Sequence, residues 1–425
     1  MTEQMNVPKL RFGEFDGEYI DTTLEDLTKK KISYGIVQAG PHIPNGMPYI
    51  KSTNLNKELC LDDLERTSDE IAKSYQRSEV VPEDIVFSLR GNIGATRIVP
   101  ETIPVANLTQ GTARLSIRNN FSNVYVNYCL GTRKAYKRVN SVSKGSTFQE
   151  ISLADLRKVK ITHSVDIKEQ QKIASFLSKV DEKISLLTEK KDKLAEYKKG
   201  VMQQLFNGSF QEQDGQLTFI PPTLRFKADD GSEFPDWEEK KLGSLADLTS
   251  SKRVYLSDYS EDGVPFFRGK EISEIRKGII PDDVLYITRK AFEEFKSKYG
   301  APVEGDILVT AVGTLANILR VTGEFEFYFK DGNLIWLRKP RCDSKFLSIL
   351  MEANRHELLK TAIGSSQKAL TIVELKKIVF KMPSLEEQQK ITIFLSSLEE
   401  KVRLANSELE KANEWKKGLL QQMFV

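Results

Sequence analysis

A duplicated segment of 38 residues constrains the fold of this chain more than any other feature of its sequence. The segment from Glu169, EQQKIASFLSKVDEKISLLTEKKDKLAEYKKGVMQQLF, aligns without a gap on the segment from Glu387, EQQKITIFLSSLEEKVRLANSELEKANEWKKGLLQQMF. The two segments are identical at 19 of 38 positions, and most of the differences keep the chemical character of the side chain. Because an internal repeat defines an architecture, the chain is predicted to consist of two equivalent halves.

Shorter matches outside these segments extend the repeat to about half of the chain. Leu10-Arg11-Phe12 corresponds to Leu224-Arg225-Phe226, and DIVFS from Asp84 corresponds to DILVT from Asp306. Each half is therefore predicted to be a variable body followed by a strongly similar helical segment. The predicted boundaries are 1–165 and 208–383 for the two bodies, and 166–207 and 384–425 for the two helical segments.

The bodies have the composition of mixed α/β structure. Short β-branched and aromatic runs such as IVFSLR, TARLSI, DILVTAV and NLIWLRK are broken by Gly, Pro, Asn and Asp at intervals typical of strands and turns. Few helical patterns separate these runs, which disfavours a doubly wound nucleotide-binding fold. The predicted fold class is α+β, with the strand order left open.

The helical segments carry an apolar seam with the spacing of a coiled coil. Apolar residues recur at alternating intervals of four and three, and Lys191 is the one break in the first segment. Asp166 and Ser384 each stand three residues before a glutamate, a pattern that predicts a capping box with Glu169 and Glu387. The predicted seam residues are Ile173, Leu177, Val180, Ile184, Leu187 and Leu194 in the first segment and Ile391, Leu395, Leu398, Val402 and Leu409 in the second.

The net charge of these helices does not suit arms that grip DNA. It is +2 from Asp166 to Phe206 and −1 from Ser384 to Phe424. One interpretation is two ordinary amphipathic helices, each packed on its own body. The repeat favours another, in which two equal helices pair antiparallel and a body lies at each end of the pair. A helix of about 38 residues spans ~57 Å, so the bodies can address two separated points on a polymer such as duplex DNA.

Composition narrows the class of protein. The length of 425 residues predicts two or three domains. The chain has 63 Lys+Arg and 60 Asp+Glu, so its net charge does not indicate a class of binding partner. Three cysteines without a CxxC spacing are typical of a reducing compartment. Since the N-terminus has no signal-peptide pattern and no apolar run has the length of a membrane span, we expect a soluble, cytoplasmic protein with no membrane partner.

Sequence motifs for catalysis are missing. The nearest approach to a phosphate-binding loop, GVPFFRGKE from Gly263, has one residue too many and a glutamate where a hydroxyl is needed. There is no NPPY-type adenine-methyltransferase motif and no glycine-rich S-adenosylmethionine loop, and the three histidines are isolated. The chain is therefore predicted to be non-catalytic, with no cofactor or metal of its own.

This arrangement resembles the specificity subunit of type I restriction-modification systems. The resemblance is carried by the duplicated EQQKI…FL segments, which close in KKGVMQQLF and KKGLLQQMF, and by the D-I-[VL]-[FV]-[ST] stretch in each body. It implies two target-recognition domains that read the two parts of a split, asymmetric sequence in double-stranded DNA. It also implies that the helices set the spacing and dock two modification subunits, which transfer methyl groups from S-adenosylmethionine. Separate restriction subunits are then expected to carry the ATP- and magnesium-dependent motor and nuclease.

Polar and basic loop residues suited to DNA contact form matching sets in the two halves. The densest basic stretch, 131–160, has a net charge of +6 and a polar, glycine-containing interior, to which AIGSSQKAL from Ala362 corresponds. Since the side chains of the two sets differ, the target is predicted to be asymmetric. The candidates are Lys51, Asn54, Arg90, Asn92, Arg97, Arg133, Lys134, Lys144, Ser146, Thr147 and Gln149 in the first half, and Arg268, Lys270, Thr310, Thr314, Asn317, Ser365, Ser366, Gln367 and Lys368 in the second.

Two other functions compete with DNA reading at this point. The chain can be a scaffold or adaptor whose coiled coil recruits proteins and whose bodies bind peptides, or an enzyme with unfamiliar motifs. The basic loops themselves can be solvated turns without a partner. A basic groove on both bodies favours DNA reading, whereas one deep pocket with clustered titratable groups favours the enzyme.

Overall fold

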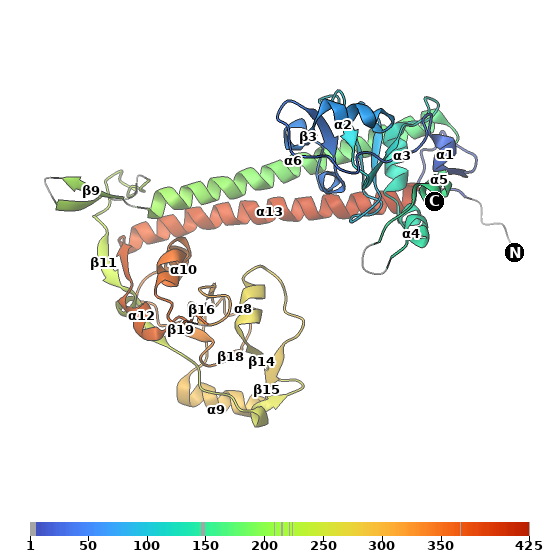
Figure 1. Ribbon diagram of the computed structural model, residues 1–425. Helices are drawn as coiled ribbons and strands as arrows, with labels where there is room; N and C mark the ends of the chain where they lie inside the picture. Colours follow the sequence, from blue (N-terminus) through green and yellow to red (C-terminus); the bar gives the residue numbers. More distant parts are fainter. Residues whose placement is uncertain are drawn as a thin grey trace. The chain divides into compact units, whose positions relative to one another are not determined.

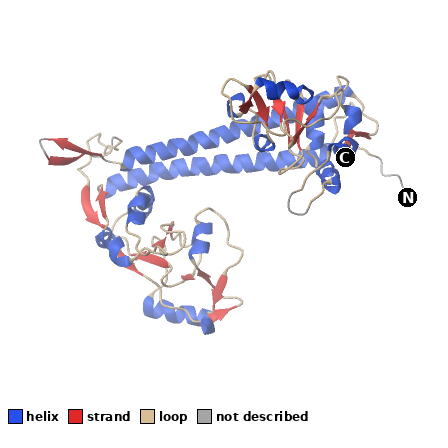
Figure 2. Ribbon diagram, viewed as in Figure 1, coloured by secondary structure: helices blue, strands red, loops and turns tan. Residues whose placement is uncertain are grey.

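The computed structural model forms two compact units, and each unit contains one body together with one end of both long helices. Unit 1 comprises Met1–Glu189 and Asn406–Val425, and unit 2 comprises Lys190–Ala405. Figure 2 shows that both bodies mix short strands with short helices. The structure describes residues 6–145, 149–207, 209–213, 216–220, 222, 224–365 and 367–424.

Unit 1 contains three small sheets, coloured blue to cyan in Figure 1. Strands β3-β2-β6 form one sheet, in which β2 and β6 are parallel, and β5-β4-β7 form an antiparallel second sheet. Strand β1 pairs with β8, which leads into the first long helix. The elements are β1 (Ile20–Thr23), α1 (Leu24–Leu27), β2 (Met47–Ile50), η1 (Ser52–Asn56), η2 (Leu61–Asp63), β3 (Glu65–Thr67), α2 (Asp69–Ser74), η3 (Gln76–Ser78), β4 (Ile85–Ser88), β5 (Thr96–Ile98), β6 (Asn107–Leu108), β7 (Thr112–Leu115), α3 (Asn123–Leu130), α4 (Arg133–Val142), α5 (Leu153–Lys158), β8 (Lys160–His163) and α6 (Ile167–Phe206).

Unit 2 repeats this topology. Strands β15-β14-β18 correspond to β3-β2-β6, including the parallel pair, and β19-β16-β17 correspond to β7-β4-β5, while β11 pairs with β20 as β1 pairs with β8. Strands β12 and β13 each add one edge. The elements are β9 (Ser209–Gln213), β10 (Gln216–Ile220), β11 (Glu238–Lys241), α7 (Leu242–Leu245), β12 (Asp247–Thr249), η4 (Leu256–Asp258), β13 (Tyr259–Ser260), β14 (Val264–Phe267), α8 (Gly269–Ile275), β15 (Leu285–Ile287), α9 (Arg289–Tyr299), β16 (Ile307–Thr310), β17 (Ile318–Arg320), β18 (Tyr328–Phe329), β19 (Leu334–Arg338), α10 (Ser344–Ala353), α11 (Arg355–Lys360), α12 (Ile372–Lys377), β20 (Val379–Met382) and α13 (Leu385–Met423).

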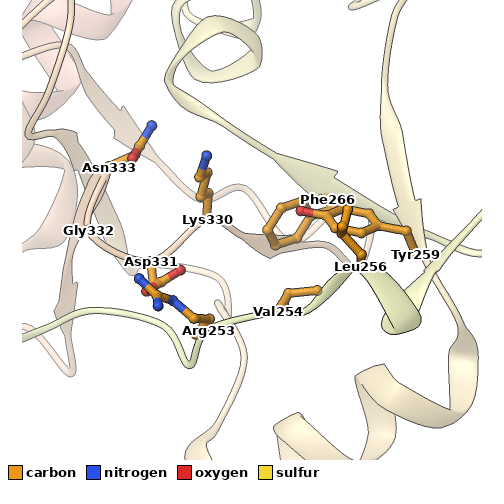
Figure 3. Close-up of a pocket in the computed structure, with 9 residues that line it drawn as sticks. All are labelled: Arg253, Val254, Leu256, Tyr259, Phe266, Lys330, Asp331, Gly332 and Asn333. Carbon is orange, nitrogen blue, oxygen red and sulfur yellow. The ribbon is translucent and has the colours of Figure 1, made fainter.

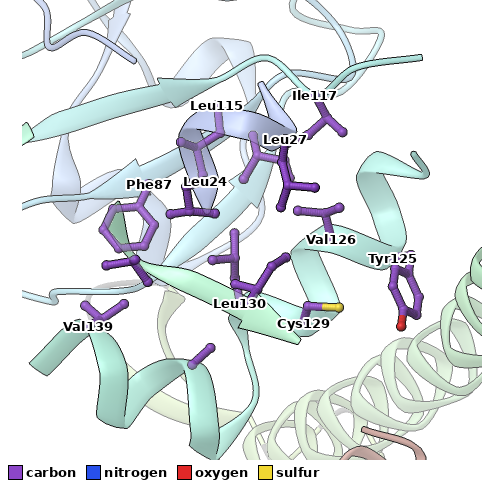
Figure 4. Close-up of a cluster of buried hydrophobic side chains, with 14 of the residues drawn as sticks. Leu24, Leu27, Phe87, Leu115, Ile117, Tyr125, Val126, Cys129, Leu130 and Val139 are labelled. Atoms are coloured by element: carbon purple, nitrogen blue, oxygen red, sulfur yellow. The ribbon is translucent and has the colours of Figure 1, made fainter. Parts of the chain in front are cut away.

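Each unit buries both long helices in its main hydrophobic core. Figure 4 shows the core of unit 1, where Phe87 and Leu115 of the antiparallel sheet meet Tyr125, Cys129 and Leu130 of α3. The same cluster includes Leu177 near the start of α6 and Leu419 near the end of α13. In unit 2 the equivalent cluster takes Leu205 from the end of α6 and Leu395 from the start of α13. Packing of apolar area in these cores therefore fixes the helix ends on the bodies.

The long helices run antiparallel within each unit, as predicted. In unit 1 the Phe176 ring packs edge-on against the Trp415 ring, with centroids 6.2 Å apart, and Lys416 forms an ion pair with Asp181. In unit 2, Lys198 forms the equivalent ion pair with Glu399, at 3.2 Å. All of the predicted seam residues are buried or half-buried, with Ile173, Leu177, Val180, Ile391, Leu395 and Leu398 buried and Ile184, Leu187, Leu194, Val402 and Leu409 half-buried. The predicted fold class is confirmed.

The helices begin directly after Asp166 and Ser384, but the predicted capping boxes are wrong. Asp166 does accept a hydrogen bond from the Lys168 amide, and Ser384 accepts one from the Glu387 amide. The Glu169 and Glu387 carboxylates, however, turn away from the cap and pair with arginines of the body, Arg11 at 2.7 Å and Arg225 at 2.7 Å. A charged guanidinium is a stronger partner for a carboxylate than a backbone amide, which explains the difference.

These arginines belong to a clamp, defined as Leu10-Arg11-Phe12 in unit 1 and Leu224-Arg225-Phe226 in unit 2. The leucine amide donates to the carbonyl of Gln422 or Gln204, near the end of one long helix. The phenylalanine ring packs on Phe176 or Phe394, near the start of the other. Three consecutive residues of each body therefore join both helices.

The carboxylate in each clamp is completely buried, with a side-chain exposure of 0% for both Glu169 and Glu387. The Tyr19 hydroxyl donates to Glu169 at 3.2 Å, and the Trp237 indole N–H donates to Glu387 at 3.1 Å. The hydrogen bond from Arg11 to Glu169 raises the pKa of the guanidinium above its ordinary value, and that of Arg225 rises for the same reason. Matched donors of the two bodies therefore satisfy both buried carboxylates.

The neighbouring glutamines, Gln170 and Gln388, also have the same contacts in both units. Each side-chain oxygen accepts from the amide that begins a short helix, that of Ser122 for α3 and that of Asp343 for α10. Each side-chain amide donates to a backbone carbonyl just before its own helix. The repeated EQ pair therefore fastens each long helix to its body.

Candidate nucleic-acid interface

Three loops meet in each unit at the end of the antiparallel sheet where the central strand, β4 or β16, finishes. In unit 1 the amide of Leu89, after β4, donates to Gly111, and the amide of Ile151 donates to Leu89. In unit 2 the same two bonds join Ala311 to Asn333 and Leu370 to Ala311. The structure therefore brings together two predicted sets, the residues that follow β4 or β16 and the residues of the glycine-containing loops.

The glycine-containing loops are closed by equivalent backbone pairs, Lys144 with Glu150 and Ile363 with Ala369. The predicted residues Lys144, Gln149, Ser365, Gln367 and Lys368 are exposed on them. Ser146, Thr147 and Ser366 lie outside the described residues. Gly364 has a φ of +118°, and a Cβ there would lie 2.3 Å from the carbonyl oxygen of Gln367, so this turn requires glycine.

Several candidates in unit 1 already have partners inside the body. The Lys51 ammonium pairs with Glu65 and lies 5.6 Å from the centroid of the Tyr49 ring. Asn54 accepts a hydrogen bond from the Lys51 amide at 2.8 Å and so caps η1. These two side chains are therefore already held in place by the body before any contact with DNA.

The other candidates after β4 are more open. Arg90 pairs with Glu150 at 2.7 Å, and its side chain is 42% exposed. Asn92 is exposed and donates to Asn56 at 3.0 Å. Arg97 donates to the carbonyl of Lys57 at 3.1 Å. Arg90 and Asn92 therefore flank the meeting point of the loops with groups that can turn towards a ligand.

In unit 2, Arg268 and Glu271 take the places of Lys51 and Asn54. The Glu271 side chain is 0% exposed and accepts from both the amide and the guanidinium of Arg268. Burial acts to raise the pKa of Glu271, but the hydrogen bonds from Arg268 outweigh burial and hold this pKa below its usual value. The equivalent cap is therefore a neutral amide in unit 1 and a carboxylate in unit 2.

A pocket of about 560 Å³ gathers the exposed candidates of unit 2. Arg268, Lys270 and Thr314 line it together with Lys277 and Asn333, which the sequence analysis did not select. Lys270 and Thr314 are exposed, so the pocket offers an ammonium group and a hydroxyl, both of which suit phosphate or base-edge contact.

Thr310 and Asn317 do not belong to this surface, which corrects the sequence prediction. Thr310 is 1% exposed, donates to the carbonyl of Thr314 at 2.5 Å and accepts from the amide of Asn317 at 2.9 Å. The Asn317 side chain is 5% exposed and donates to the hydroxyl of Ser273 at 2.7 Å. Both side chains are buried and hydrogen-bonded within the turn after β16, as buried polar groups in folded proteins usually are. They are therefore not available to a ligand.

A second pocket of unit 2 contains residues that the sequence analysis missed (Figure 3). It has a volume of about 410 Å³, and Lys330 and Asn333 extend to the same side of it. Arg253 pairs with Asp331 at 3.4 Å, and the Tyr259 and Phe266 rings pack edge-on at the other end. The turn KDGN from Lys330 was the available signal, since it separates two strand-like runs.

Unit 1 has a larger groove, which we call the α13 groove. It has a volume of about 1070 Å³ and lies between the β4–β5 loop, the α3–α4 junction and the last turns of α13. The predicted candidates Asn92, Arg133 and Lys134 line it together with Lys416 and Lys417, which the sequence analysis did not select. The net charge of the whole helix had hidden this local concentration of lysines.

Other classes of site receive no support from the described residues. Within these ranges, no group of three or more His, Cys, Asp or Glu side chains is placed to hold a metal ion. His163 is buried, its Nε2 lies 2.8 Å from the Thr22 hydroxyl, and burial lowers its pKa. None of the helices that the structure describes has the length and apolar character needed to cross a membrane.

Comparison with known proteins identifies the family to which the chain belongs. Residues 18–196 and 235–414 each match the family model described as type I restriction modification DNA specificity domain. The chain belongs to this family. The two matched regions correspond to the two halves of the sequence repeat, so the chain is a type I specificity subunit with two DNA specificity domains, which fits the reading of a bipartite target.

Curated relatives agree with the family assignment. The type I restriction enzyme MjaVIII specificity subunit of Methanocaldococcus jannaschii is 25% identical over 327 residues, 74% of this chain and 72% of that protein. The putative type I restriction enzyme MjaX specificity subunit of the same organism is 26% identical over 98% of this chain and 95% of its own length.

The fold of this specificity subunit is shared with solved structures. The S subunit of a type I restriction-modification system from M. genitalium gives a TM-score of 0.57 at 16% identity, covering 99% of both chains. A chain from a study of complex assembly and conformational transition of the type I R-M system gives 0.58 at 13% identity, covering 97% of this chain and 98% of that one. With the family assignment, DNA reading replaces the adaptor and enzyme alternatives.

Proposed function

We propose that each body reads one half of an asymmetric, bipartite DNA target through its three meeting loops. One observation carries this proposal: the two units repeat the same backbone bonds between these loops but present different side chains on them. An exposed surface that combines lysine, arginine, asparagine and hydroxyl groups suits phosphate and base-edge contacts.

The two long helices are proposed to set the gap between the half-sites. Helix α6 has 40 residues and α13 has 39, so each is about 60 Å long. A clamp at each end ties both helices to a body, which supports their use as a spacer rather than as flexible linkers.

The chain is proposed to supply specificity to enzymes that it does not itself contain. Two modification subunits are proposed to dock on the helices and to transfer methyl groups from S-adenosylmethionine to adenine. Restriction subunits are proposed to supply the ATP- and magnesium-dependent motor and nuclease. The pseudo-repeat supports two equivalent docking surfaces, because equivalent helix faces recur in both units.

Sequencing of methylated adenines in cells with and without the gene tests this proposal. We expect one methylated motif to disappear with the gene, and this motif should consist of two specified parts separated by an unspecified gap. Methylation that is unchanged, or a motif that is continuous or palindromic, would contradict the proposal.

A further inference from the structure

We infer that the α13 groove of unit 1 binds the phosphate backbone of the DNA beside the first half-site, and that the equivalent surface of unit 2 does not. This inference rests on the proposed function, because it concerns the same DNA. In addition, unit 1 then supplies more of the electrostatic contribution to DNA binding than unit 2.

The α13 groove is lined by cations without acidic residues. Arg133, Lys134, Lys416 and Lys417 line it, and none of the described residues that line it is Asp or Glu. Arg133, Lys134 and Lys417 form no ion pair with any residue in the described ranges, and Lys416 pairs only with Asp181 at the edge. Burial lowers the pKa of Lys134, and the nearby Arg138 guanidinium lowers it further. The groove therefore gathers four cations, of which only Lys416 has an acidic partner among the described residues.

The position of two of these cations is unfavourable in the free protein. Arg133 and Lys134 occupy the first turn of α4, which contains no acidic residue. The helix dipole places partial positive charge at this end, so cations there are repelled unless an anion lies nearby. A phosphate in the groove would relieve this repulsion.

The groove also includes residues of the β4–β5 loop, one of the three meeting loops. Asn92 and Gly94 of the β4–β5 loop line it, together with Asn413 and Gln421 of α13. Phosphate contacts fix the register of a protein on duplex DNA, while base contacts give specificity. A backbone segment held here would place the adjacent bases at the loop that carries Arg90 and Asn92.

The equivalent surface of unit 2 has its cations engaged by the protein. Lys198 of α6 corresponds to Lys416 and pairs with Glu399 at 3.2 Å. Arg355, the first residue of α11, takes the place of Arg133, and its guanidinium donates to the carbonyls of Ala316 at 3.0 Å and Leu315 at 2.7 Å. A phosphate would have to compete with these contacts, so this surface offers little gain.

The salt dependence of DNA binding by the complete complex with its modification subunits tests the inference. The test variant is R133Q together with K417Q. The matched control is K199Q, because Lys199 stands on α6 at the position equivalent to Lys417. Each lost phosphate contact reduces the slope of log K against log salt by about one. We therefore expect the double variant to lower the slope by about two, to weaken binding equally for target and non-target DNA, and to leave the recognised sequence unchanged.

Further variants separate the possible results. R133K with K417R should keep the wild-type slope, and circular dichroism should show equal helix content in all variants. A double variant with the wild-type slope would overturn the inference, as would a slope change of equal size in K199Q. Loss of modification subunits in native mass spectrometry, without a change in slope, would also overturn it and would assign the groove to an acidic protein segment. Failure of the wild-type complex to prefer its target would instead contradict the proposed function.

Discussion

The clamps and the loop tips of the two units show opposite patterns. At the clamps, the same buried arginine–glutamate pair, the same leucine amide bond and the same phenylalanine contact occur in both units. At the loop tips, equivalent backbone positions carry different exposed groups, such as Asn92 in unit 1 and Thr314 in unit 2. The scaffold therefore holds each body by the same contacts, while the surface presented to DNA is free to vary.

The exchange of one body is expected to have the largest effect. If the body from about Asp214 to Met382 is replaced by that of a relative with another target, one half of the methylated motif should change completely and the other half should stay. Methylation sequencing measures this directly. A change in both halves would show that the bodies are not independent readers.

Removal of a clamp carboxylate should have the next largest effect. Glu169→Ala and Glu387→Ala each leave a largely buried arginine without its partner, and loss of one member of a buried ion pair typically costs about 3 kcal/mol or more. Both variants should be destabilised by similar amounts in urea unfolding. Exposed Glu414→Ala, on the same helix as Glu387, serves as a control and should change stability by less than about 0.5 kcal/mol. Unequal losses at the two clamps would show that they are not equivalent.

The carboxylate cap of unit 2 should make that unit more sensitive to acid than the amide cap of unit 1. The folded pKa of Glu271 is held below its unfolded value, so its contribution to stability is present above the unfolded pKa of about 4.3 and is lost as the pH falls through the folded pKa. The stability difference between the wild type and Glu271→Gln should therefore shrink below about pH 4. The same comparison for Asn54→Ala should stay constant with pH, since an amide does not titrate. Thermal unfolding at a series of pH values measures both.

Local sequence patterns predicted the scaffold well. The seam is defined by a period of a few residues, and the helix starts at Ile167 and Leu385 follow capping residues that are visible in the sequence. The contacts of Glu169 were wrongly predicted, because its partner Arg11 lies 158 residues away and no local pattern encodes it. Long-range pairs of this kind depend on the tertiary fold.

The surface was less predictable than the scaffold. Burial of Thr310 and Asn317 depends on how the turn after β16 folds back on α8, which their polar character did not indicate. Lys416 and Lys417 were missed because a net charge averaged over a helix conceals which face its cations occupy. The repeat did identify the loops that meet, since equivalent loops of a duplicated fold occupy equivalent places.

A change in helix length bears directly on the proposed role of the helices as the spacer between two readers. Insertion of four residues into α6 between Leu187 and Leu194 should lengthen that helix by about 6 Å. Since duplex DNA rises ~3.4 Å per base pair, the unspecified gap in the methylated motif should grow by one or two base pairs, with the specified bases unchanged. The insertion shifts the seam, so circular dichroism must first show that the variant folds. A folded, active variant that methylates the motif with its original gap would show that the helices do not set the spacing.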